Sequence, residues 1–150
     1  DGRTGVDRVA DFMRFLAPPV RGAATAASAA GERIFSTLDC AACHTPMMKT
    51  GKSDIAALSE KTVELYSDLL LHDMGALGDG IVQGTAGARD MRTAPLWGLR
   101  TRPTWLHDGR ANTVDAAIRA HAGEAQNSRE RYEALGATER TQLLAFLDTL

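Results

Sequence analysis

Apolar residues recur at helical spacing near both ends of the chain. In segment 4–17, five apolar residues lie three or four positions apart, and Pro18 and Pro19 end the pattern. This segment predicts a short helical extension at the N-terminus. An alanine-rich helix is predicted next, and it leads directly into residues 40–44. The apolar face of this second helix consists of Ala27, Ala30, Ile34, Phe35 and Leu38.

Three more helices are predicted after residue 112, and each begins at a capping residue. Thr113, Ser128 and Thr138 are the expected N-caps, and Gly123 and Gly136 end the first two helices. The buried stripe of the last helix is expected to be Leu143, Leu144, Leu147 and Leu150. The region from 45 to 110 is rich in glycine and other turn-forming residues and shows no strand-like alternation. The pattern therefore predicts an all-α fold with long ordered loops.

The length and net charge of the chain limit the number of domains and the kinds of partner that we expect. A chain of 150 residues suits one domain, so we expect a single domain over 1–150 with a helical extension at about 4–17. The net charge of -2 gives no reason to expect nucleic acid as a partner. No apolar run approaches the roughly 20 residues that span a bilayer, so no membrane span is expected. Aromatic residues make up only 5% of the chain, which suggests that something besides rings fills the interior.

Both cysteines of the chain lie in one motif, CAACH, which runs from Cys40 to His44. A disulfide between them would close too small a loop to stabilise the fold much. A tetrahedral zinc site needs two more ligands at suitable spacing, and a thioredoxin-like dithiol follows a strand rather than a helix. A c-type haem uses all three residues, because each cysteine joins one vinyl group and His44 then binds the iron. We therefore expect one covalently attached haem c, held in a cytochrome c-like domain.

The occupant of the second axial position decides whether that iron transfers electrons or catalyses a reaction. His121 is favoured by geometry, since it continues the apolar face of the helix that begins after Thr113. Met74 and Met91 are the alternatives, 30 and 47 residues after His44, at distances where small cytochromes commonly supply methionine. The full set of candidates is His72, Met74, Met91, His107 and His121.

Arginines and tryptophans crowd into the segment before this helix. Guanidinium groups suit the two propionates of a haem, because they bind a carboxylate through paired hydrogen bonds. Indole rings can pack against a flat porphyrin. The residues expected to contact the haem, besides those of CAACH, are Arg92, Trp97, Trp105 and Arg110.

Four stretches of the sequence resemble a known family: YSDLLLHDMG, RTAPLWGLR, LHDGRA and AIRAHAGEA. They are similar to the C-terminal haem domain of the bacterial di-haem oxidoreductases, also called thiol-oxidoreductase-like proteins, which are relatives of the di-haem cytochrome c peroxidases. The resemblance covers about Phe12 to Leu150. In the peroxidases, the ninth residue of the threonine-initiated helix after HDG is the distal ligand of the electron-transfer haem. Counted from Thr113, that residue is His121, so the resemblance implies a bis-histidine haem.

The expected function is therefore the transfer of single electrons through a six-coordinate haem. Family members commonly carry an N-terminal domain with another haem, which we do not expect in residues 1–150, so an open substrate-binding iron is not implied. The partner would be a redox protein or a second haem domain, in the periplasm or another exported location. The alternative is half of a peroxidase or oxidase, in which a distal ligand leaves the iron to admit substrate. A third possibility is a haem-bearing structural subunit.

Overall fold

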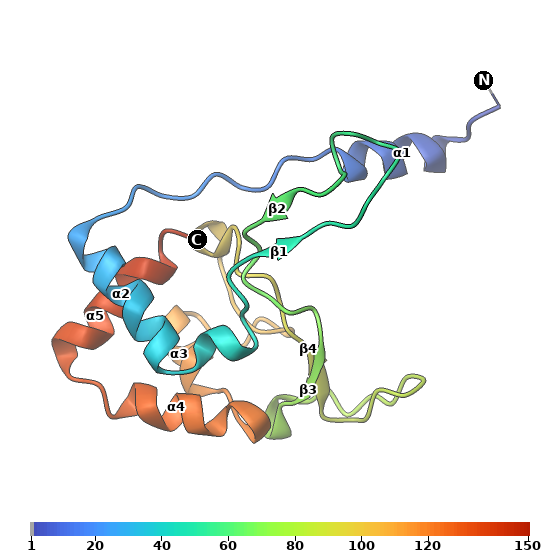
Figure 1. Cartoon of the computed structure of the whole chain (residues 1–150). Coiled ribbons are helices and arrows are strands. Elements are labelled where there is room, and N and C mark those ends of the chain that lie inside the picture. The colour runs from blue at the N-terminus through green and yellow to red at the C-terminus, as the bar shows by residue number, and fades with distance from the viewer. Residues whose placement is uncertain (1) are drawn as a thin grey trace.

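The computed structural model describes residues 2–150, with the helices mostly on one side of the molecule and the strands on the other (Figure 1). The five α-helices are α1 Gly5–Arg14, α2 Ala26–Thr37, α3 Val114–Arg119, α4 Gln126–Glu133 and α5 Ala137–Leu147. The four strands are β1 Met48–Lys49, β2 Thr62–Val63, β3 Leu71–Asp73 and β4 Asp90–Arg92. Short 3₁₀ helices cover Cys40–Ala42, Gly75–Leu77, Leu99–Thr101 and Gly123–Ala125.

The prediction of an all-α, cytochrome c-like fold is wrong, because the middle of the chain forms two small antiparallel sheets. Strand β1 pairs with β2, with Met48 opposite Val63, and β3 pairs with β4, with His72 opposite Met91. Each strand has only two or three residues, which is too short for a visible alternation of apolar and polar positions. The sheets therefore occupy a region whose sequence reads as loop.

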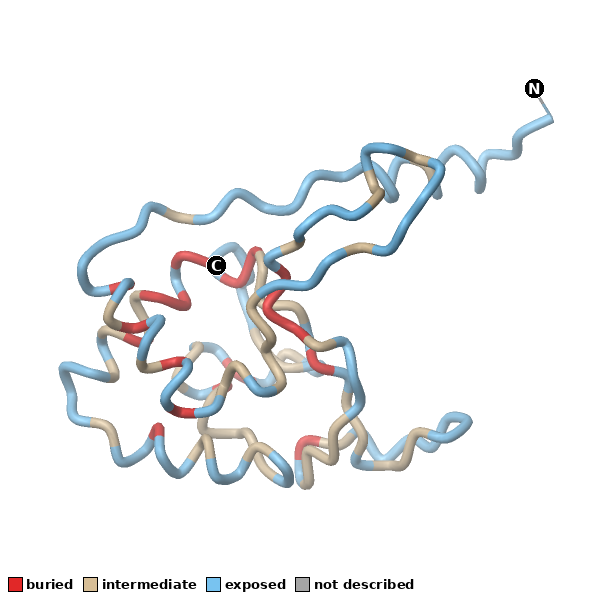
Figure 2. The backbone as a smooth tube through the Cα atoms, viewed as in Figure 1, coloured by how far each residue is buried: buried red, intermediate tan, exposed pale blue. Residues whose placement is uncertain are grey.

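The core lies where α2 packs against α5. Figure 2 shows buried backbone concentrated on these two helices and on the chain that follows β2. Gly31 of α2 allows the helices to approach closely, because a Cβ atom at this position would lie 2.0 Å from the carbonyl oxygen of Gln142 in α5. The core cluster consists of Phe35, Leu38, Tyr66, Leu99, Tyr132, Leu143, Phe146, Leu147 and Leu150.

Helix α1 forms as the apolar spacing predicts, but it lies far from the helical core at the end of an extended segment (Figure 1). Its capping box joins Thr4 and Asp7. None of its residues is buried, and Phe12 remains 64% exposed. The apolar stripe of α1 therefore does not contribute to the core. No helix in residues 2–150 combines the length and the apolar character that crossing a membrane requires.

In the C-terminal helices, one predicted N-cap is confirmed and two are wrong. The Thr113 hydroxyl accepts a hydrogen bond from the backbone N–H of Ala116 and begins α3 as expected. Ser128 lies inside α4, and α5 begins after Gly136 rather than at Thr138. In the predicted stripe of the last helix, Leu143, Leu147 and Leu150 are buried and Leu144 is half-buried.

Candidate functional site

The CAACH motif forms a tight turn directly after α2. Helix α2 ends at Thr37, and Asp39 adopts a left-handed conformation with φ 63°, which an aspartate tolerates better than most residues. A 3₁₀ helix then covers Cys40–Ala42, and the backbone N–H of His44 donates to the Cys40 carbonyl at 2.9 Å. The turn brings the two cysteines and the histidine close together on a short piece of backbone.

The segment before β3 holds the CAACH turn through three backbone hydrogen bonds. The backbone N–H groups of Tyr66, Ser67 and Asp68 donate to the carbonyls of Pro46, Thr45 and Cys43, at 3.3, 3.0 and 2.8 Å. Tyr66 has a positive φ of 54°, an unfavourable conformation for a residue with a bulky side chain. Such strain is typical of sites where the surrounding structure imposes one backbone geometry.

The ring of His44 is oriented by this strained residue. Its Nδ1 atom lies 3.1 Å from the carbonyl oxygen of Tyr66. A carbonyl can only accept a hydrogen bond, so Nδ1 carries the proton and Nε2 keeps its lone pair. Burial lowers the pKa of His44 to about 4, despite the opposing effect of this hydrogen bond. His44 is therefore neutral at physiological pH, in the form that binds metals.

The ring of His121 is oriented in the same way, by a backbone carbonyl. It lies two residues beyond the end of α3, and its Nδ1 atom is 2.8 Å from the Ala117 carbonyl oxygen. That contact places the proton on Nδ1 and leaves the lone pair on Nε2. Burial lowers the pKa of His121 as well. Both rings thus present a neutral Nε2, and neither Nε2 has a hydrogen-bond partner among residues 2–150.

The rings of His44 and His121 lie close enough together to bind one metal ion between them. Their centres are 6.5 Å apart, and the ring planes are inclined by 52°. An imidazole nitrogen binds a first-row metal at about 2 Å, and its ring centre lies about 1 Å further out, so two opposed imidazoles have centres roughly 6 Å apart. The separation of His44 and His121 is close to this value. Hydrogen bonds from Nδ1 to a carbonyl are also the usual outer contacts of metal-binding histidines.

The cysteines are free thiols with little tendency to ionise. Burial raises the pKa of Cys40 to about 11 and also raises that of Cys43. A catalytic dithiol needs a lowered thiol pKa, because the thiolate is the nucleophile. The environment of these two cysteines therefore does not suit a thioredoxin-like reaction.

The other predicted haem contacts lie in several places. Trp105 packs against the core, and its indole N–H is buried without a hydrogen-bond partner among residues 2–150. Trp97 lines a groove of about 630 Å³ beneath the segment that follows α1. Arg92 is exposed in β4, and Arg110 is exposed and paired with the neighbouring Asp108.

The two methionine alternatives lie in and beside the β3–β4 sheet. Met91 is in β4, opposite His72 of β3, and Met74 follows β3 directly. Both are half-buried. His107 is exposed in the loop before α3.

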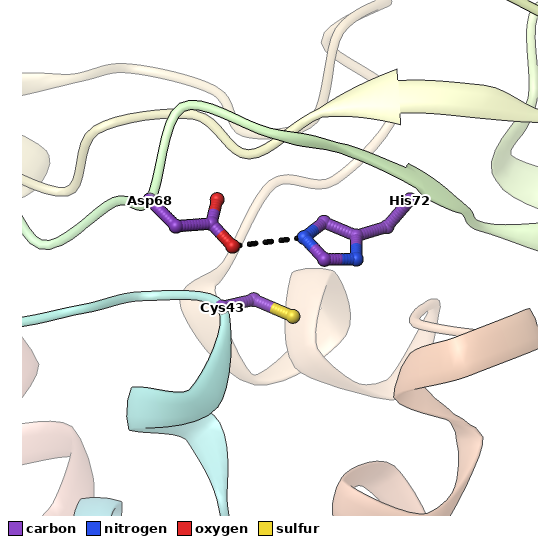
Figure 3. Close-up of side chains that lie close together, drawn as sticks. All are labelled: Cys43, Asp68 and His72. Carbon is purple, nitrogen blue, oxygen red and sulfur yellow. Dashed lines mark hydrogen bonds and ion pairs between the residues drawn. The ribbon is translucent and has the colours of Figure 1, made fainter.

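A cluster that the sequence did not reveal adjoins the CAACH turn. His72 lies between two carboxylates, with Nε2 2.9 Å from Asp68 Oδ2 and Nδ1 2.8 Å from Glu124 Oε2. Figure 3 shows Asp68 and His72 together with Cys43. The hydrogen bond to Glu124, and then that to Asp68, raises the pKa of His72. Glu124 is 52 residues from His72, so no local pattern relates them.

These features fit a haem. Two neutral imidazoles lie 6.5 Å apart between ring centres, and one of them belongs to a CxxCH motif with two free thiols. The buried indole N–H of Trp105 is a donor that an added carboxylate, such as a propionate, would satisfy. The site is thus of the kind found in haem-binding redox proteins.

A comparison with protein families agrees with this class. The family model described as "Di-haem oxidoreductase, putative peroxidase" matches residues 4–150. The chain belongs to this family, and it is a haem-related oxidoreductase. No curated protein and no solved structure matches the chain.

Proposed function

We propose that the chain transfers single electrons through one haem c, joined to Cys40 and Cys43 and bound axially by His44 and His121. The observation that carries the proposal is the pair of imidazole rings, 6.5 Å between centres, each with its Nδ1 directed at a backbone carbonyl. When bound, the haem supplies an iron that alternates between two oxidation states by one electron.

The residues of the chain favour a six-coordinate iron. The carbonyls of Tyr66 and Ala117 fix the rings of His44 and His121, so both axial nitrogens are held in place before metal binding. Burial keeps both rings neutral and therefore able to bind. With both imidazoles bound, the iron of a haem would have no free position for substrate, which supports electron transfer.

The ligand pair also indicates a direction for the reduction potential. Methionine as an axial ligand raises the potential of a cytochrome c haem, so two imidazoles give a lower value than a histidine and methionine pair. The partner is a redox protein or a second haem domain, and the compartment is the periplasm or another exported location. The covalent attachment of haem through CxxCH supports that location.

A second candidate is half of a peroxidase, in which the distal ligand leaves the iron. The family description, which includes peroxidase, favours it. His121 also lies outside helix α3, two residues beyond its end.

The test is the visible and near-infrared spectrum of the haem-loaded protein in both redox states. We expect low-spin haem, no sulfur-to-iron charge-transfer band and no binding of carbon monoxide. His121→Ala should give a high-spin ferrous form that binds carbon monoxide. His107→Ala, which changes an exposed histidine, is the matched control and should leave the spectrum unchanged.

The covalent attachment of haem to the cysteines is tested separately. Haem should stay with the chain on a denaturing gel, and Cys40→Ala should weaken its retention. A sulfur-to-iron band in the unaltered protein would move the assignment to Met74 or Met91. A high-spin spectrum would favour the peroxidase.

A further inference from the structure

We propose that, before haem is attached, the chain binds one divalent cation of the zinc type through Cys43, Asp68 and His72. One possible ligand atom from each residue lies within 4.8 Å of the others, and all three residues are half-buried. Figure 3 shows the thiol, the carboxylate and the imidazole directed toward a common space. The thiol comes from the CAACH turn, and the other two groups come from the chain that enters and forms β3.

The ligand types match those of zinc. Zn²⁺ takes sulfur, nitrogen and oxygen ligands at about 2.0 to 2.3 Å in a tetrahedral arrangement, which places neighbouring ligand atoms roughly 3 to 4 Å apart. The three ligand atoms, all within 4.8 Å of one another, are therefore close to this spacing. Three protein ligands leave the fourth position to water.

Glu124 supports the site through His72 without binding the cation itself. It accepts a hydrogen bond from Nδ1 of His72 at 2.8 Å, and it is itself held by the backbone N–H of Asp73 at 3.0 Å. A carboxylate that orients a histidine through its second nitrogen is the usual outer contact of a zinc-binding imidazole. The contact leaves Nε2 of His72 facing Asp68 at 2.9 Å, on the side where the cation would bind.

Charge favours a cation at this position. The carboxylates of Asp68 and Glu124 both contact His72, and no other cationic side chain contacts the three ligands in residues 2–150. Binding displaces any proton carried by the Cys43 thiol or by Nε2 of His72. The product holds a thiolate, a carboxylate and a neutral imidazole, so the two negative charges of the ligands balance the two positive charges of the cation.

The site and the haem compete for Cys43. A sulfur that has formed a thioether with a vinyl group carries no negative charge and is a poor zinc ligand. The cation should therefore occupy the Cys43 sulfur until haem is attached, and haem attachment should release the cation. This competition rests on the proposed function, whereas cation binding by the haem-free chain does not.

The test is a titration of the full, haem-free, reduced chain with Co²⁺, followed by Zn²⁺. We expect one equivalent of Co²⁺ to give a thiolate-to-cobalt charge-transfer band, and Zn²⁺ to remove it. Glu124→Gln should weaken binding about 10- to 100-fold, the usual effect of losing an outer contact, and His72→Ala should weaken it at least as much. Cys40→Ser is the matched control, because Cys40 is outside the cluster.

Circular dichroism of each variant, with and without Zn²⁺, separates lost ligation from lost folding. Asp68→Asn keeps the shape of the side chain and should also weaken binding. If Cys40→Ser weakens binding as much as Cys43→Ser, the ion sits on the CxxC dithiol and the proposal is wrong. Absence of a thiolate band, or no effect of His72→Ala, would overturn it equally.

The haem-loaded protein separates this proposal from the proposed function. If Cys43 forms a thioether, the charge-transfer band should be absent from the loaded protein and present in the haem-free chain. A band of equal strength in both forms would support the cation site and contradict haem attachment at Cys43.

Discussion

The close crossing of α2 and α5 provides a sharp test of the fold. Gly31 is buried in α2, and a Cβ atom there would lie 2.0 Å from the Gln142 carbonyl oxygen and 2.8 Å from Cβ of Phe146. The nearest atom belongs to the backbone of α5, so it cannot move aside as a flexible side chain would. Gly31→Ala should therefore force the two helices apart.

The expected effect can be worked out from these distances. In a free helix, replacing glycine with alanine stabilises by about 0.5 to 1 kcal/mol. Here the methyl group is well short of the ordinary contact distance of 3.4 Å, and overpacking of this kind costs about 1 to 3 kcal/mol or more. Because backbone must move, we take the upper end and expect a net loss of about 2 kcal/mol. For a chain of this size that lowers the Tm by roughly 4 to 8 °C.

The assay is thermal unfolding of the haem-loaded protein, followed by far-ultraviolet circular dichroism. Gly5→Ala is the matched control, because Gly5 lies in the exposed helix α1 and a Cβ atom there meets nothing within 4 Å. The control should leave the Tm unchanged. If Gly31→Ala raises the Tm as an unhindered helix position would, the close approach of α2 and α5 is refuted.

Two more predictions concern His72 and the cap of α3. The pKa of His72 in the folded chain is raised by Glu124 and Asp68, so its stabilising effect is complete below the unfolded pKa of about 6.5 and is lost as pH rises through the folded pKa. Urea unfolding across this range should show that loss, and His72→Gln should abolish it; an unchanged pH dependence would contradict the pairing. Thr113→Ala should cost about 1 kcal/mol in the same assay, whereas Thr138→Ala should cost less because Thr138 does not cap α5.

The helices could be predicted from the sequence better than their boundaries. The spacing of apolar residues indicates α1, α2 and α5, because this spacing is a local property of the chain. Ser128 and Thr138 resemble caps but lie inside helices, since which of several nearby polar residues begins a helix depends on how that helix packs. The strands were missed because two or three residues carry no periodic signal.

The residues of the candidate site could also be predicted only in part from the sequence. The spacing of CAACH alone predicts Cys40, Cys43 and His44 as the residues that hold a haem. Helical spacing favours His121, yet α3 ends at Arg119, and the ring is instead oriented by its hydrogen bond to a carbonyl of the last turn.

What the sequence by itself determined is local: the apolar stripes of the helices, the Thr113 cap and the spacing of CAACH. The tertiary structure alone decided which groups meet. It placed the ring of His121 6.5 Å from that of His44, brought Glu124 to His72, and left the apolar face of α1 exposed. The physical reason is that helical spacing and capping depend on neighbours within a few residues. Contacts between residues 50 or more positions apart depend on how the whole chain packs.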